Sequence, residues 1–150
     1  MRLPRSIGVV VAGLVAVSCG DSTAPPERVN ALYVLESIGG QPLPATFAAD
    51  PLETATVFWA TLNLDPAGNA TLAERRRSVW QTSQQERTIA IQTDYEIIGE
   101  DISIGPPCRH HPLALCVPKR VGKLQGQTLT LRYDFEEPHL TYTYRLAVGN

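Results

Sequence analysis

Apolar and polar residues alternate along most of the chain after residue 31. The alternation is clearest in two segments near the end, residues 128–135 and 140–148. In each of them every second residue is apolar, and most of the residues between are polar. Successive side chains of a β-strand point to opposite faces, so this period of two predicts half-buried strands. The four residues that separate the segments include Pro138 and indicate a turn, so we predict a terminal β-hairpin.

The same period occurs upstream, in residues 58–64, in the segment that starts at Thr71, and in residues 89–97. A strong turn signal, Asp-Pro-Ala-Gly-Asn, occupies residues 65–69. We interpret residues 122–127 as a tight connection into the last hairpin, and a short helix between Pro44 and Glu53 is conceivable. In all, the chain predicts about seven to nine short strands and no long helix. This indicates an all-β fold, a meander closed into a barrel or folded as a sandwich, and we favour closure because it leaves no exposed edge.

The first eighteen residues differ from the rest of the chain. Arg2 and Arg5 precede an apolar run over residues 7–17, which is too short for a stable membrane span and is typical of a signal peptide. Small residues then lead to Cys19. This arrangement resembles the bacterial lipobox, and the resemblance implies lipidation of Cys19, with Gly20 favouring the outer membrane. The alternative is an ordinary secretory signal with an incidental cysteine.

These boundaries divide the chain into three parts: a signal peptide at 1–18, a lipid-anchored linker at 19–30 and a β-domain at 31–150. The polar, proline-containing linker is expected to be a flexible tether. Acyl chains would hold the protein on the membrane, because two or more chains give stable anchoring.

Five stretches of the domain together carry a family resemblance: YVLESIGGQPLP (33–44), DPAGN (65–69), DYEIIGEDISI (94–104), GKLQGQTLTLRY (122–133) and TYTYRL (141–146). They resemble small bacterial lipoproteins with a lipocalin-like domain, over residues 31–148. The resemblance implies a single antiparallel up-and-down meander, closed into a small lipocalin-like barrel. It implies architecture more than activity, because fold does not determine function.

Composition narrows the possible functions. The chain has 150 residues, 13 Lys plus Arg against 15 Asp plus Glu, a formal charge of −2, and 43% hydrophobic residues. That is enough for one domain with a core. The mildly acidic balance and the lack of a long basic run argue against nucleic acid as the main partner.

Two cysteines besides Cys19 bracket a proline-containing loop. Cys108 and Cys116 lie in an exported protein, where thiols oxidise, so we predict a disulfide between them. The alternative is a zinc site with His110 and His111. Its spacing matches no common zinc motif, and we expect no metal.

A run of three arginines, residues 75–77, lies in the strand that starts at Thr71. If Leu72 points inward, regular pleating also points Glu74, Arg76 and Trp80 inward, where the charges must be paired or solvated. Such a barrel mouth would suit a polar or anionic ligand. We favour the other interpretation, in which both faces of this strand are wet or a bulge resets its register.

No catalytic constellation is evident, and we expect neither an enzyme nor a bound cofactor. The histidines are confined to His110, His111 and His139, and neither a nucleophile elbow nor a phosphate-binding loop is present. Two functions remain. In the first, we expect the barrel of this cell-envelope protein to hold a small apolar or amphipathic ligand. Alternatively, a filled barrel contacts another envelope protein or the cell wall, through an exposed patch near Val57 and Trp59.

Overall fold

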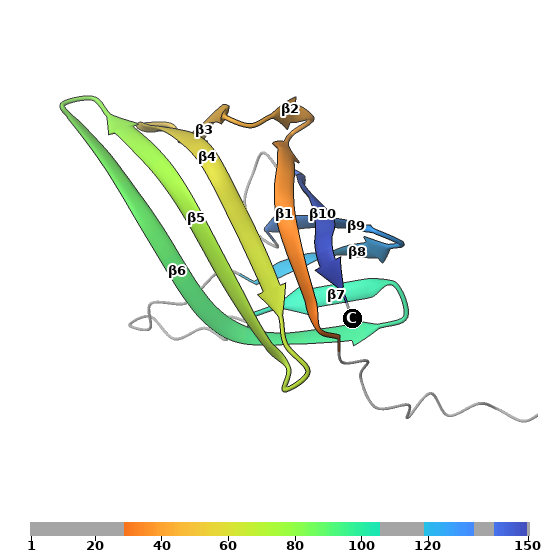
Figure 1. Cartoon of the computed structure of the whole chain (residues 1–150). Coiled ribbons are helices and arrows are strands. Elements are labelled where there is room, and N and C mark those ends of the chain that lie inside the picture. Colours follow the sequence, from red (N-terminus) through yellow and green to blue (C-terminus); the bar gives the residue numbers. More distant parts are fainter. Residues whose placement is uncertain (1–28, 106–118, 134–139, 150) are drawn as a thin grey trace, which may run out of the picture.

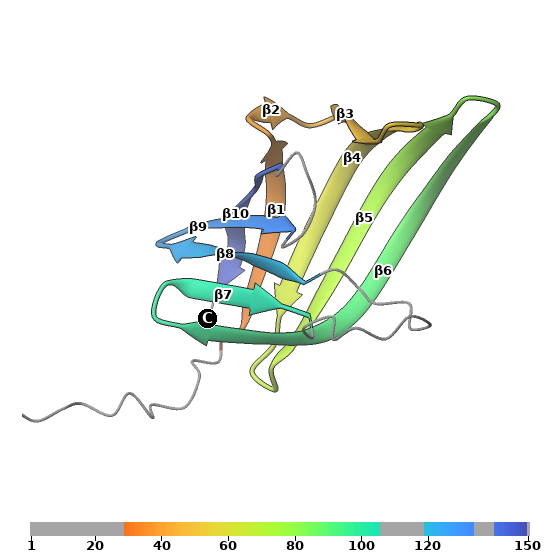
Figure 2. The same ribbon diagram turned by 180° about the vertical axis from the view of Figure 1, so that it is seen from behind.

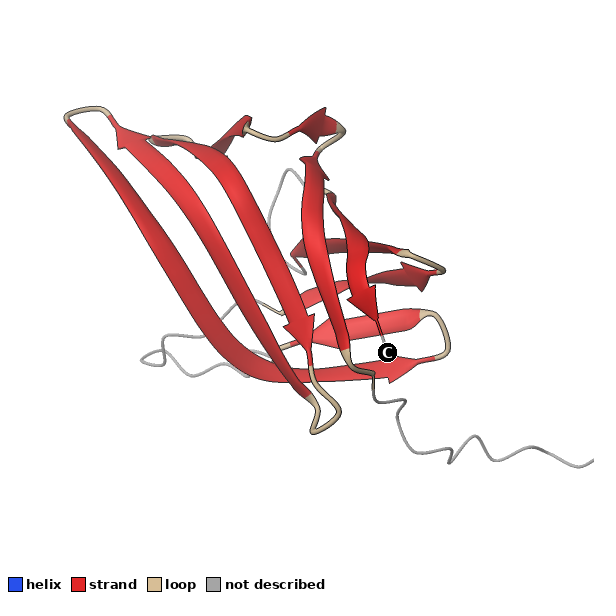
Figure 3. Ribbon diagram, viewed as in Figure 1, coloured by secondary structure: helices blue, strands red, loops and turns tan. Residues whose placement is uncertain are grey.

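A computed structural model describes residues 29–105, 119–133 and 140–149, and every regular element in these ranges is a β-strand (Figures 1 and 3). The ten strands are β1 (Ala31–Ile38), β2 (Gln41–Pro42), β3 (Ala45–Asp50), β4 (Glu53–Leu64), β5 (Asn69–Trp80), β6 (Ser83–Ile98), β7 (Asp101–Ile104), β8 (Arg120–Gln125), β9 (Thr128–Tyr133) and β10 (Tyr142–Gly149).

Eight of these strands form a closed antiparallel ring. Neighbours around the ring follow the chain from β4 to β10, β10 pairs with β1, and β1 pairs back with β4. The two remaining strands lie outside the ring, where β2 pairs with β1 and β3 pairs with β4. The predicted up-and-down meander closed into a barrel is therefore confirmed.

The ring is closed along only part of its length. β1 pairs with β4 over four residues, Ala31 to Val34 against Leu64 to Thr61, and further along its edge β4 pairs with β3 instead. The long strand β6 pairs with β7 only through residues 95–98, and residues 83–93 pair with β5 alone among the described strands. Strands β4 to β6 consequently run beyond the rest of the barrel, as Figure 2 shows. We call this part the open half and the rest the closed half.

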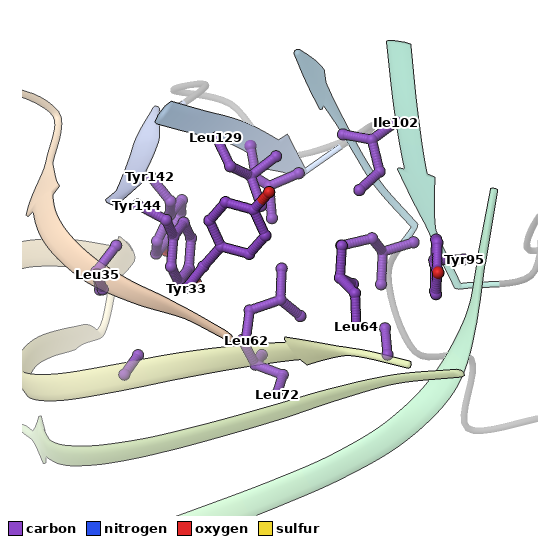
Figure 4. Packing of buried hydrophobic residues seen from close by; sticks show 14 of the residues in the cluster. Tyr33, Leu35, Leu62, Leu64, Leu72, Tyr95, Ile102, Leu129, Tyr142 and Tyr144 are labelled. Atoms are coloured by element: carbon purple, nitrogen blue, oxygen red, sulfur yellow. The ribbon is translucent and has the colours of Figure 1, made fainter. Parts of the chain in front are cut away.

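The closed half contains the hydrophobic core. Alternate residues of its strands point inward and are buried, and the largest of those with almost no exposure include Leu62, Leu64, Ile97, Ile104, Leu129 and Leu131. Tyr33 lies among them, between Leu62 and Leu129 (Figure 4). Each such side chain stabilises the fold by about 1.5–3 kcal/mol when it leaves water, so this half provides most of the hydrophobic stabilisation.

The predicted turn at residues 65–69 ends the closed half. Asp65 accepts hydrogen bonds from the backbone N–H and the side-chain amide of Asn69, at 2.9 and 2.8 Å, and Gly68 has a positive φ of 94°. The Tyr95 hydroxyl donates to the Asp65 carbonyl at 2.8 Å and accepts from the Val29 N–H at 3.0 Å. Tyr95 thus ties the start of the domain to the closed end of the barrel.

The structure differs from the sequence analysis at two places. Residues 45–50 form β3 and not a helix, because their backbone groups pair with β4. Residues 122–125 belong to β8, and only Gly126 and Gln127 form the turn. Gly122 suggested a connection between strands, but in the structure it allows the backbones of β8 and β9 to approach closely. A Cβ at Gly122 would overlap the backbone carbonyl of Thr130 on β9.

Several other predictions concern residues outside the described ranges. These are the signal peptide at 1–18, residues 19–28 of the predicted linker with Cys19, the cysteine loop with Cys108 and Cys116, and the turn at 136–139. Among the residues described, no helix is long and apolar enough to cross a membrane.

Candidate ligand site in the open half

The central arginine of the run on β5, Arg76, points into the barrel. β5 pairs with β6 without a register shift, so its alternation is unbroken and Glu74, Arg76 and Ser78 share the inward parity of Leu72. The favoured interpretation of wet faces or a reset register is wrong for this part of β5. A bulge does exist, but Phe58 of β4 carries it, and the residues of β5 opposite follow one another regularly.

Arg76 is satisfied by its neighbours. It forms an ion pair with Glu53 (Nη2–Oε1 2.6 Å), lies 3.7 Å from an oxygen of Glu74, and donates to the Ser78 hydroxyl at 3.2 Å. The three charged side chains are only 13–20% exposed. Charges so far removed from water are tolerated when they are paired, so these contacts explain how charge is accommodated here.

A second inward arginine, Arg120 at the start of β8, is less well satisfied. The residue is only 7% exposed. Its Nη2 donates to the Tyr133 hydroxyl at 2.9 Å, and the guanidinium lies over the Tyr133 ring, 4.7 Å from the centroid. The other terminal nitrogen, Nη1, is buried and has no acceptor in the described part of the chain. An unsatisfied donor of this kind costs about 1–3 kcal/mol, or more when it is charged.

The surroundings of Arg120 keep it charged. Burial alone would lower the pKa of its guanidinium, but Tyr133, Tyr144 and Glu74 outweigh burial, and the pKa is raised. Burial raises the pKa of the Tyr144 phenol well above its ordinary value. At neutral pH the Tyr144 phenol is therefore uncharged.

Aromatic and aliphatic side chains continue the lining from Arg120 into the open half. Tyr133 meets Tyr142 edge to face, with ring centroids 5.5 Å apart, and Tyr142 meets Phe47 of β3 in the same way at 6.4 Å. Across the barrel, Ile89 and Ile91 of β6 share the inward parity of Tyr95 and are only half-buried. The lining of the open half therefore combines apolar side chains with the charges of Glu53, Glu74, Arg76 and Arg120.

Arg75 and Arg77, the outward members of the run, make a separate surface cluster. Both bind Glu86 of β6, Arg77 at 2.9 Å, and both guanidinium groups lie over the ring of Phe58, at 5.7 and 5.1 Å from its centroid. Hydrogen bonds from Arg77 and Arg75 lower the pKa of the Glu86 carboxyl. This cluster connects β4, β5 and β6 on the outer face.

The outer wall of the closed half carries a groove of about 520 Å³. Its lining comes from β6 to β9 and the residue before β10, and includes Glu96, Ile98, Ser103, Val121, Lys123 and Arg132. Ile98 is 66% exposed, and Lys123 forms an ion pair with Asp101 at 2.8 Å. The exposed patch expected near Val57 and Trp59 does not form, because Val57 is buried and only Trp59 is partly exposed.

Sequence reasoning identified Arg76 and Glu74 as inward candidates but missed Arg120 and Glu53. Arg120 could have been found if residues 120–125 had been interpreted as a strand, because its parity matches that of Leu124. Among the described residues, no group of His, Cys, Asp and Glu is placed to hold a metal ion. His110, His111 and His139 lie outside the described ranges.

Comparison with known proteins gave no match, whether to models of protein families, to curated proteins or to solved structures.

Proposed function

We propose that this chain is a non-catalytic, lipid-anchored envelope protein that binds a small amphipathic molecule in the open half of its barrel. The observation that carries the proposal is the mixed lining of that half. Half-buried Ile89 and Ile91 face inward from β6, and the inward charges of β5 lie beside them, with Glu74 directly opposite Ile89 in the pairing. Binding sites for small molecules combine apolar walls with a few placed polar groups in the same way.

In this proposal the closed half stabilises the fold and the open half binds the ligand. The closed half is filled by its own leucine, isoleucine and tyrosine side chains, which provide the stability. In the open half, residues 83–93 of β6 have a strand partner on one side only in the described structure, and the side chains of residues 83–88 are exposed. Inward apolar surface that the described strands leave partly exposed gains free energy when a ligand covers it.

The anchor is part of the same proposal. Lipidated Cys19 would begin a tether that ends at Val29, which Tyr95 ties to the closed end. Ten flexible residues have a root-mean-square length of roughly 17 Å. The closed end would therefore lie near the membrane and the open half would face away from it, in the periplasm or at the cell surface. The envelope location also supports the proposed disulfide between Cys108 and Cys116.

A second function is favoured by one observation, the groove on the outer wall. A protein partner could bind there through the exposed Ile98 and the charges of Lys123 and Arg132 around it. This would make the chain an interaction protein with a filled barrel. The lumen and the outer wall are separate surfaces, so variants can distinguish the two functions.

The test is native mass spectrometry of the full chain purified gently from its own host. We expect a small molecule to co-purify with the chain, and Ile89→Trp, which adds bulk on the inner face of β6, to reduce its occupancy about tenfold or more. The matched control is Ala90→Trp, because Ala90 is the next residue of β6 and points outward. A protein that co-purifies instead, and is lost in Ile98→Asp, would support the second function.

The anchor has its own test. Cys19→Ser should abolish labelling of the chain by a radioactive fatty acid and release it from washed membranes. Labelling that persists in this variant contradicts the lipoprotein proposal but leaves ligand binding unaffected.

A further inference from the structure

We propose that Arg120 binds the carboxylate of an acidic amphiphile whose apolar part lies along the open half. This inference rests on the proposed function and specifies its ligand class. It starts from the buried Nη1 of Arg120, for which the described residues provide no acceptor.

The geometry around Arg120 limits what can satisfy it. The Tyr133 hydroxyl accepts a hydrogen bond from Nη2, and the Tyr133 ring lies against one face of the guanidinium. These two contacts hold the guanidinium in place. Nη1 remains as a fixed, buried donor. A guanidinium recognises carboxylates especially well, because its donors are rigid and its charge shortens and strengthens each bond. A ligand carboxylate at Nη1 would thus find a preorganised partner.

Two carboxylates on the inner faces of β4 and β5, those of Glu53 and Glu74, lie beside the other inward arginine. Glu53 binds Arg76 at 2.6 Å, and the closest oxygen of Glu74 lies 3.7 Å from the same guanidinium. The charge of Glu74 contributes to the raised pKa of Arg120, but Glu74 accepts no hydrogen bond from Nη1. Glu74 therefore competes with an acidic ligand through charge and does not replace it.

The position of Arg120 also indicates where the apolar part of the ligand lies. Tyr133, which holds Arg120, packs against Tyr142, and Tyr142 packs against Phe47. Glu74, which acts on Arg120, is opposite Ile89 in the pairing of β5 and β6. Apolar side chains thus extend from Arg120 on both walls, and a chain attached to the bound carboxylate would lie between them.

The experiment compares two probes on the full chain in an uncharged detergent. Both probes carry the same long alkyl chain and the same solvent-sensitive fluorophore, and one ends in a carboxylate and the other in an alcohol. We expect the chain to bind the acid about tenfold or more tightly than the alcohol. Arg120→Met should remove this preference and leave alcohol binding unchanged, and Glu74→Gln should increase the preference because it removes the competing charge.

The outcomes separate the inference from the function it rests on. Equal affinity for acid and alcohol in the unmodified chain, with both lost in Ile89→Trp, would overturn the role of Arg120 and leave ligand binding in place. If neither probe binds, both the role of Arg120 and the proposed ligand binding would be overturned. Should Arg120→Met fail to fold, Tyr133→Phe provides the second variant. It keeps the charge but frees the guanidinium, and it should weaken acid binding several-fold while alcohol binding stays the same. Unchanged acid binding in Tyr133→Phe would contradict the inference.

Discussion

The two halves of this barrel are built from the same strands but are stabilised differently. In the closed half every strand has a partner on both sides, and inward positions hold buried Leu, Ile and Tyr. In the open half, one edge of β4 pairs with the short β3 and part of β6 has one strand partner. Inward positions there hold Glu53, Arg76 and Ser78 beside the buried Ala55 and Val57. A strand that extends beyond the hydrophobic core can therefore carry charged and polar side chains on its inner face without loss of the fold.

The two inward arginines show the same contrast on a smaller scale. Arg76 has a carboxylate partner at 2.6 Å, a second carboxylate nearby and a hydroxyl. Arg120 is more deeply buried and has one phenol. Paired charge is an ordinary structural solution, whereas an incompletely satisfied buried donor is a cost to the fold that binding sites commonly bear.

The largest effect is expected from Gly122→Ala, which attacks the closed half where β8 and β9 approach. The added Cβ would overlap the Thr130 carbonyl, which is backbone and cannot move without displacing the strand. We expect a loss of about 3 kcal/mol or more, up to loss of the folded barrel. Urea denaturation followed by circular dichroism measures it. Gly126→Ala is the control, because a Cβ there meets open space and only its φ of 60° opposes it, a cost of about 1–2 kcal/mol.

Leu62→Ala tests whether the closed half carries the stability. Leu62 is fully buried, so its truncation should lower the free energy of unfolding by about 2–5 kcal/mol. Leu52 is 63% exposed beside the open half. Leu52→Ala should therefore change the free energy of unfolding by about 0.5 kcal/mol or less. Similar losses from both variants would mean that the halves do not differ in the way described.

A third pair of variants compares the arginines. Arg76→Met leaves Glu53 and Glu74 without their cation, and we expect a loss of about 1–3 kcal/mol, because both carboxylates keep some contact with water. Arg120→Met removes a buried charge with one neutral partner, so its loss should be below about 1 kcal/mol, or a gain. Equilibrium unfolding in urea gives both values. A larger loss at Arg120 than at Arg76 would identify Arg120 as a structural residue.

The smallest effect concerns the outer cluster of the open half and depends on pH. The pKa of Glu86 is lowered from its ordinary value of 4.5 by Arg77 and Arg75. Its contribution to stability is therefore present above the pKa of the unfolded chain and is lost as pH falls through the lower, folded pKa. Glu86→Gln should lower the urea midpoint slightly at pH 7. It should cause no difference once Glu86 is protonated in both states, and added salt should reduce the effect at pH 7.

Most of the strands and the turn at residues 65–69 could be predicted from the sequence, because alternation and turn chemistry are local properties of the chain. Parity also raised Glu74 and Arg76 as inward candidates, although we favoured wet faces or a reset register for that strand. The sequence also led to the prediction of closure, since an open sheet would expose its edges. It did not reveal β3 or the true extent of β8, because the short β3 segment ATFAAD has no clear period of two and Gly122 interrupts the pattern of β8.

The place where the barrel closes and the pairing of its charges depend on contacts between distant parts of the chain. Pairing of β1 with β4 joins residues about 30 positions apart, and its restriction to four residues creates the open half. The contrast between Arg76 and Arg120 likewise depends on side chains from different strands, Glu53 of β4 for one and Tyr133 of β9 for the other. Such contacts depend on register and on strand length across the sheet, and no local pattern in the chain encodes them.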